Sequence, residues 1–188
     1  IAGNNDTLCI DDTPLTFTGF SPANGIWSGT GITDINVGVF DPSIAGAGTH
    51  ILTYTHGSGT CEKTITKTVY VDPLPVINAG SNETYCINNS VITLSGYSPQ
   101  GGVWTGTGIV DANAGTFDPS IGQGTYTLTY TYTDPITTCI NTATKTVTVH
   151  PLPVVNAGAN QSVCIDNGTF DMSGHSPTGG VWTGTGIV

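Results

Sequence analysis

Two segments of the chain alternate strictly between threonine and a second set of side chains. Residues 125–132 place three tyrosines and a leucine on one side and threonine at every other position. Residues 142–149 repeat the pattern with Ala, Lys, Val and Val opposite four threonines. A period of two is that of a β-strand with two different faces. We therefore predict two strands that form a hairpin through the turn-like segment 134–138.

Shorter apolar segments precede this hairpin and predict further strands. They lie near Pro75–Asn78, Val91–Leu94, Val103–Val110 and Gly115–Phe117. The composition agrees, because the chain has 33 Thr and 26 Gly but no Arg, and strong helix formers are scarce. Six or seven short strands separated by turns predict an all-β immunoglobulin-like sandwich.

The same set of landmarks occurs three times along the chain, at spacings of 77 and 78 residues. They are Gly3, Gly80 and Gly158; Cys9, Cys86 and Cys164; Ser21, Ser98 and Ser176; Trp27, Trp104 and Trp182. Residues 76–110 and 154–188 are identical at 22 of 35 positions. This period is too long for a solenoid and fits a tandem array of small sandwiches. We expect unit one at residues 1–73, unit two at 74–151 and an incomplete unit three at 152–188.

Each boundary carries a short linker with two prolines, Asp72–Pro75 and His150–Pro153. Proline favours extended geometry, so we predict stiff spacers and an elongated rod that rises by about 40 Å per unit. Unit three should contain the early strands but lack the late hairpin. We expect the natural chain to continue with the missing half; strands supplied by another chain are the alternative.

Each complete unit carries one early and one late cysteine. The simplest interpretation pairs them within units, Cys9 with Cys61 and Cys86 with Cys139, and leaves Cys164 unpaired in this segment. Each bridge would close a loop of about 50 residues and stabilise the unit by about 4 kcal/mol. Stable disulfides indicate an oxidising, extracellular environment. The cysteines lack histidines at ligand spacing, so no zinc or other metal site is expected.

The charge limits the classes of partner. Three lysines against 13 acidic residues give a net charge of −10, which disfavours nucleic acid and an anionic membrane surface. No apolar run reaches the length of a spanning helix, so no membrane insertion is expected. The histidines do not recur in register, and catalytic and phosphate-binding motifs are missing. We predict a non-enzymatic protein without a cofactor.

Two recurring residue types are candidates for a special role. Trp27, Trp104 and Trp182 are expected to be core aromatics, and a sugar-stacking surface is the alternative. Lys67 and Lys145 lie on the apolar face of the last strand of their units. We interpret them as charges that discourage edge-to-edge aggregation. The alternative, an isopeptide crosslink from each lysine to an Asn side chain, would need a buried acid beside the pair, and none is evident from the sequence.

The motifs SGxSPxGGxWTGTGIVD, GTFDPSIGQGTYTLTYTYTD and KTVTVxPLPV carry a family resemblance. The chain resembles the Ig-like repeats of large secreted surface adhesins of Bacteroidota, of the gliding-motility and type 9 secretion type. The resemblance implies a repeat module of an extracellular filament that adheres or projects a binding tip. The alternatives are a carbohydrate-binding repeat of a secreted polysaccharide-degrading enzyme and a virion fibre. Expected partners are neighbouring repeats; other copies in a filament and surface polysaccharide are further candidates.

Overall fold

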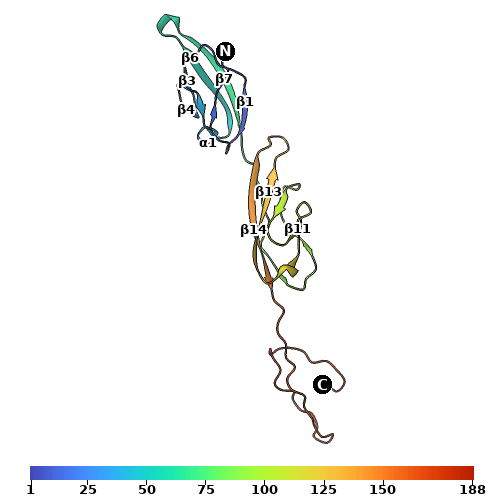
Figure 1. The fold of residues 1–188 in the computed structure, drawn as a ribbon. Helices are drawn as coiled ribbons and strands as arrows, with labels where there is room; N and C mark the ends of the chain where they lie inside the picture. Colours follow the sequence, from blue (N-terminus) through green and yellow to red (C-terminus); the bar gives the residue numbers. More distant parts are fainter.

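The computed structural model describes residues 1–188 as an elongated molecule (Figure 1). Units one, two and three follow one another end to end, with the N-terminus in the first and the C-terminus in the last. No strand of one unit is hydrogen-bonded into a sheet of another. The chain therefore forms a rod in which each complete unit has sheets of its own.

Each complete unit contains seven strands. Those of unit one are β1 (Asp6–Cys9), β2 (Leu15–Thr16), β3 (Ile26–Ser28), β4 (Ile32–Asp34), β5 (Val39–Phe40), β6 (Gly48–His56) and β7 (Lys63–Asp72), with short helices α1 (Pro42–Ala45) and η1 (Gly59–Cys61). Those of unit two are β8 (Glu83–Cys86), β9 (Ile92–Thr93), β10 (Val103–Thr105), β11 (Ile109–Asp111), β12 (Thr116–Phe117), β13 (Gly124–Thr133) and β14 (Ile140–His150), with the 3-10 helix η2 (Pro119–Ile121).

Two sheets make up each complete unit. The order is β1-β7-β6-β3 and β2-β5-β4 in unit one, and β8-β14-β13-β10 and β9-β12-β11 in unit two. The predicted hairpin is confirmed, since β13 and β14 pair antiparallel over ten residue pairs. The first strand of each unit was not predicted. It runs parallel to the last strand, β1 beside β7 and β8 beside β14.

The sheets enclose one hydrophobic core per unit. Each core contains eight buried residues, including a tryptophan, a phenylalanine and a tyrosine at matching positions. The Tyr130 hydroxyl accepts from Gly102 N at 2.8 Å and donates to Pro99 O at 2.5 Å, so a buried polar atom is satisfied while it anchors a loop. The prediction of an all-β chain of sandwich units with a disulfide is confirmed.

Two of the predicted early strands differ in detail. The segment Pro75–Asn78 is not a strand, and only Asn78 makes an isolated bridge. The segment Val103–Val110 contains two strands, β10 and the start of β11, separated by a turn. Gly106 lies in that turn with φ +136°, and a Cβ there would lie 2.7 Å from the Leu128 side chain. The glycine is needed both for the turn and for close packing.

Unit three contains no strand within residues 152–188. Its only bridge joins Asn156 and Ser176, so the expectation of regular early strands there was wrong. The reason is that in unit two the early strands β8 and β10 form by pairing with the late strands β14 and β13. Residues 152–188 contain no counterpart of that hairpin, and none of β12, with which β9 and β11 pair. The early segments therefore have no edge on which to pair.

Candidate functional site: the junction between units one and two

The linker between the first two units follows β7 directly. Strand β7 ends at Asp72, and Pro73 and Pro75 then hold the chain extended before unit two begins. The Asn141 side chain, near the start of β14, donates from Nδ2 to Pro75 O at 3.0 Å. The linker is thus hydrogen-bonded to unit two as well as continuous with unit one.

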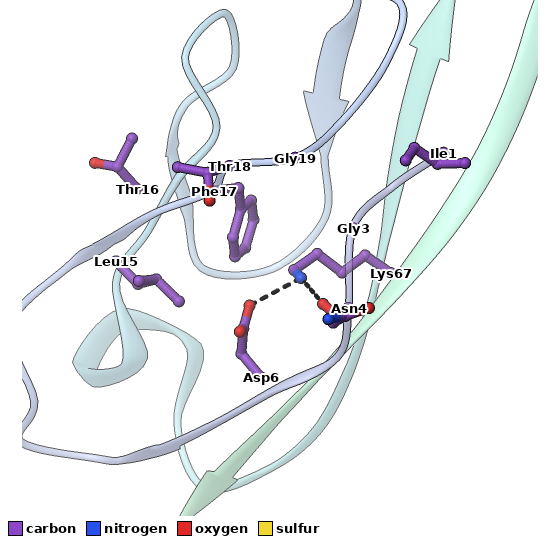
Figure 2. Close-up of a pocket in the computed structure, with 10 residues that line it drawn as sticks. All are labelled: Ile1, Gly3, Asn4, Asp6, Leu15, Thr16, Phe17, Thr18, Gly19 and Lys67. Atoms are coloured by element: carbon purple, nitrogen blue, oxygen red, sulfur yellow. Dashed lines mark hydrogen bonds and ion pairs between the residues drawn. The ribbon is translucent and has the colours of Figure 1, made fainter.

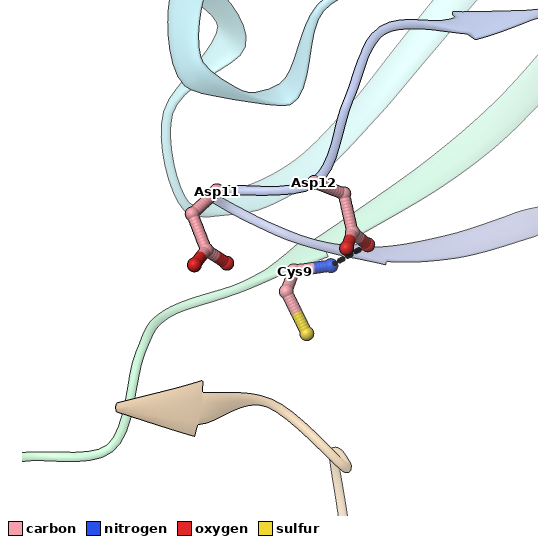
Figure 3. Close-up of side chains that lie close together, drawn as sticks. All are labelled: Cys9, Asp11 and Asp12. Atoms are coloured by element: carbon pink, nitrogen blue, oxygen red, sulfur yellow. Dashed lines mark hydrogen bonds between the residues drawn. The ribbon is translucent and has the colours of Figure 1, made fainter. Parts of the chain in front are cut away.

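Cys9 lies beside this linker because of the parallel register of β1. It is the last residue of β1 and is paired with Asp72, the last residue of β7. The backbone N of Cys9 donates to Asp12 Oδ2 at 2.7 Å, which fixes the turn that follows the strand (Figure 3). The end of unit one that faces unit two therefore carries a positioned cysteine.

Cys139 lies at the facing end of unit two, in the connection between β13 and β14. Asp134 organises this turn, since its Oδ1 accepts from Ile136 N at 2.8 Å and from Thr137 N at 3.0 Å. The hydrogen bond from Thr137 N has the larger effect and that from Ile136 N the smaller, and together they lower the pKa of the Asp134 carboxyl below its ordinary value. Asp134 N also donates to Cys139 O at 2.9 Å, so the cysteine backbone is held in place.

A disulfide joins Cys9 to Cys139 across the junction, with their Cα atoms 5.6 Å apart. The thiols of Cys61, Cys86 and Cys164 are free and exposed. The predicted pairs Cys9–Cys61 and Cys86–Cys139 were therefore wrong.

The physical reason is the length of the last strand. Cys9 is level with Asp72 at the end of β7, whereas Cys61 precedes Lys63 at its start. Ten strand residues span roughly 30 Å, but two bridged Cα atoms lie within about 7 Å of one another. The early and late cysteines of one unit thus lie at opposite ends of it. Cys9 and Cys139 instead meet each other across the junction.

The bond stabilises the units as strongly as an internal bridge would. While unit one is folded, pairing in its sheet holds Cys9 beside Asp72. The disulfide from Cys9 to Cys139 therefore closes the chain from Asp72 to Cys139 into a loop of about 70 residues. The chain-entropy relation gives about 4 kcal/mol for a loop of this length. The same bond therefore stabilises a unit and fixes the geometry of the junction.

The carboxylates near Cys9 do not make a metal site. Asp11, Asp12 and the Cys9 sulfur lie within 4.8 Å of one another (Figure 3). The sulfur is bonded in the disulfide, and Asp12 accepts from the Cys9 backbone. At the corresponding positions unit two has Asn88 and Asn89, and Asn89 caps the turn in the same way, at 2.7 Å from Cys86 N. The recurring role is that of a turn cap.

The tryptophans of the complete units lie inside the sandwiches. Trp27 and Trp104 are 0% exposed, and their indole Nε1 atoms have no hydrogen-bond partner. The Trp104 ring packs 5.0 Å from Tyr130 and 5.4 Å from Tyr97, between ring centroids. Trp182 in unit three is half-buried. A sugar ring cannot reach the two fully buried indoles, so they offer no stacking surface.

The repeated lysines are buried ion-pair members. Lys145 is 2% exposed, and its Nζ lies 2.6 Å from Glu83 Oε1 and 3.2 Å from Ser95 O. Lys67 is 4% exposed, and its Nζ lies 2.8 Å from Asp6 Oδ2. The interpretation of both lysines as edge charges was wrong, because β7 and β14 are central strands whose inward face covers the core.

The two ion pairs differ in their access to water. The Asp6 side chain is 34% exposed and borders a cavity of about 370 Å³ in unit one (Figure 2). Figure 2 also shows Lys67 reaching the backbone oxygen of Asn4. The Glu83 side chain is only 14% exposed. Burial would raise the pKa of Glu83, but hydrogen bonds from Lys145, Tyr85 and the Ser95 backbone lower it overall. Unit two thus holds the more enclosed pair.

No helix in the structure is both long and apolar enough to cross a membrane.

No protein-family model matches the chain, and no curated protein matches it. Among solved structures, it is similar to a SusE-like surface located polysaccharide binding protein from the Bacteroides thetaiotaomicron heparin utilisation locus, with 9% identity and a TM-score of 0.41 over 77% of this chain and 33% of that one. It is also similar to Drosophila N-cadherin EC1-4, with 9% identity and a TM-score of 0.35 over 81% and 48% of the two chains. Both TM-scores are below 0.5, so the fold is described from the sheets and cores above and not from these similarities.

Proposed function

We propose that the chain is a non-enzymatic structural segment of an extracellular stalk or filament, which holds an adhesive or ligand-binding part away from a cell surface. The observation that carries the proposal is the Cys9–Cys139 disulfide across the junction. A bond placed between two units, and not within either, constrains their relative position. Its persistence also implies an oxidising compartment, which supports a location outside the cell.

The disulfide also changes how the chain carries tension. A force applied to the two ends passes from Cys9 to Cys139 directly through the disulfide, because the bond links them covalently. The chain between the two cysteines does not carry that force. The bridged residues are 130 apart in sequence, and this length of chain would extend to roughly 450 Å if unfolded. With the bond intact, the segment between the two cysteines cannot lengthen. A stalk that must hold its tip at a fixed distance benefits from this property.

Single-molecule pulling on the whole chain, attached at both termini, tests this proposal. In oxidising buffer, the extension gained on unfolding should exclude the bridged segment. After reduction, the same molecule should gain roughly 450 Å more. The Cys139→Ser variant should behave like the reduced chain in either buffer, and Cys61→Ser, which removes a free thiol, should behave like the unaltered chain. Equal extensions with and without reductant would refute the proposal.

A further inference from the structure

The free thiol of Cys86 occupies the position in unit two that Cys9 occupies in unit one. Cys86 ends β8 and is paired with His150, the last residue of β14, as Cys9 is paired with Asp72. Ile87 N donates to His150 O at 2.9 Å, as Ile10 N does to Asp72 O. The backbone geometry that presents Cys9 to its partner is thus repeated at the opposite end of unit two.

The segment that follows Cys86 is also the same. A turn capped by Asn89 comes directly after it, and the linker His150–Pro153 matches Asp72–Pro75 in length and in both proline positions. A complete unit placed after this linker would present its late cysteine as unit two presents Cys139. The exposed thiol therefore has a defined partner position, although residues 152–188 contain only the early cysteine Cys164.

We propose that Cys86 is one half of a second junction disulfide, whose other half is the late cysteine of a complete repeat unit following unit two. Every junction of the array would then be closed between the early cysteine of one unit and the late cysteine of the next. Cys61, exposed at the far end of unit one, occupies the late position and would take the early cysteine of a preceding unit. This pairing follows from the junction geometry and holds whether or not the rod serves adhesion.

The bond forms by thiol–disulfide exchange with an organic disulfide such as oxidised glutathione. The Cys86 thiolate attacks one sulfur of the oxidant, and a mixed disulfide forms as the first thiolate leaves. The thiolate of the late cysteine then attacks the Cys86 sulfur and displaces the second. Two cysteine thiols are oxidised to one disulfide, one organic disulfide is reduced to two thiols, and the two cysteine protons pass to the departing thiolates.

An extended chain provides the test. Residues 1–188 are followed directly by a second copy of residues 111–150, which completes unit three because Val188 corresponds to Val110 in the repeat. Thr142→Ser in the added copy gives the peptide of the added Cys139 a mass of its own. After refolding with reduced and oxidised glutathione, free thiols are alkylated and the linked peptides are mapped by mass spectrometry. We expect Cys86 linked to the added copy of Cys139, beside the original Cys9–Cys139 bond, with Cys61 and Cys164 alkylated.

Matched variants distinguish the outcomes. Cys86→Ser should abolish the new linked peptide completely, whereas Cys164→Ser should leave it unchanged. A link between Cys164 and the added cysteine would overturn the proposal in favour of pairing within units. Linked peptides between two chains, or an unpaired added cysteine in a folded unit three, would overturn it as well. Retention of the Cys9–Cys139 peptide in such a result leaves the proposed stalk function standing.

Folding of the added unit is checked separately, by hydrogen exchange of its late hairpin. If that hairpin is unprotected, the same mapping is done on residues 1–153 followed by a full second copy of residues 76–150, in which Thr84→Ser and Thr142→Ser give the peptides of both added cysteines masses of their own. Every strand of that third unit has the partners that it has in unit two. The expected link is again between the original Cys86 and the second copy of Cys139, and its absence there rejects the proposal.

Discussion

The buried pair Lys145–Glu83 gives a prediction whose magnitude follows from burial. Glu83→Gln keeps the shape of the side chain but leaves the enclosed ammonium without its carboxylate. Removing one partner of a buried pair costs about 3–5 kcal/mol. The amide oxygen and Ser95 O can still accept from the lysine, so we expect a cost of about 3 kcal/mol, at the lower end.

The matched change in unit one should cost much less. Asp6→Asn removes the carboxylate beside Lys67. The Lys67 ammonium that remains lines the same cavity as the one-third exposed Asp6 side chain, so water in that cavity can solvate it. Exposed pairs are worth at most about 1 kcal/mol, and we expect a cost near that value. The contrast between the two variants tests burial, because both remove a single carboxylate beside a lysine at the same position of the repeat.

Hydrogen exchange followed by mass spectrometry reads the two units separately, through peptides of β13 and β14 and of β6 and β7. Combining Glu83→Gln with Lys145→Met should recover most of the lost stability, because the flexible thioether can pack near Trp104 without a charge. Equal losses from Asp6→Asn and Glu83→Gln, or no recovery in the double variant, would refute the argument from burial.

Three further results are expected. Cys139→Ser should lower the free energy of unfolding of unit two by about 4 kcal/mol, which thermal melting measures. Cys61→Ser, which removes a free thiol, should leave the melting temperature unchanged. Similar melting temperatures of the two variants would contradict the role of the junction bond. Tyr130→Phe should cost about 1–3 kcal/mol in denaturant titration, because two backbone groups lose their buried partner; a cost below about 0.5 kcal/mol would count against that anchor. The pKa of Glu83 in the folded chain lies below its ordinary value of 4.5. Its contribution to the stability of unit two is therefore present above pH 4.5 and is lost as the pH falls through the folded pKa. Hydrogen exchange measured between pH 5 and pH 3 should show a steeper loss of stability in the unaltered chain than in Glu83→Gln, and equal slopes would contradict this.

The hairpin of unit two was predictable because its signal is local. Alternation over residues 125–132 and 142–149 sets which side chains face the core, and the connection between them is short. The strand β8 was not predicted, because its four residues are too few to show a clear two-residue alternation. It forms by parallel pairing with β14, more than 50 residues later in the chain.

The cysteine pairing depended on that missed strand. An even count per unit favours pairing within units, but it carries no information on which end of the sandwich holds each thiol. The parallel register of β1 with β7 places Cys9 beside the linker. The sequence carried only half of the signal, because it placed Cys61 just before the last strand, whereas the first strand, which Cys9 ends, was not predicted.

The acids that pair with the lysines were missed for a similar reason. Asp6 and Glu83 are 77 residues apart, so an acid recurs at one position of the repeat, as the lysine does. Neither lies near its lysine in sequence, and only the parallel pairing of the first and last strands brings them together. The recurrence of both charges could have suggested the pair, but not its burial.

The most direct test of the account is the disulfide map of the purified, unreduced chain. Free thiols are alkylated in denaturant, the chain is digested, and linked peptides are identified by mass spectrometry. We expect one linked pair, Cys9 with Cys139, and alkylation of Cys61, Cys86 and Cys164. A Cys9–Cys61 or Cys86–Cys139 peptide would contradict it, because the cysteines would then close single units and leave the junction without a covalent bond.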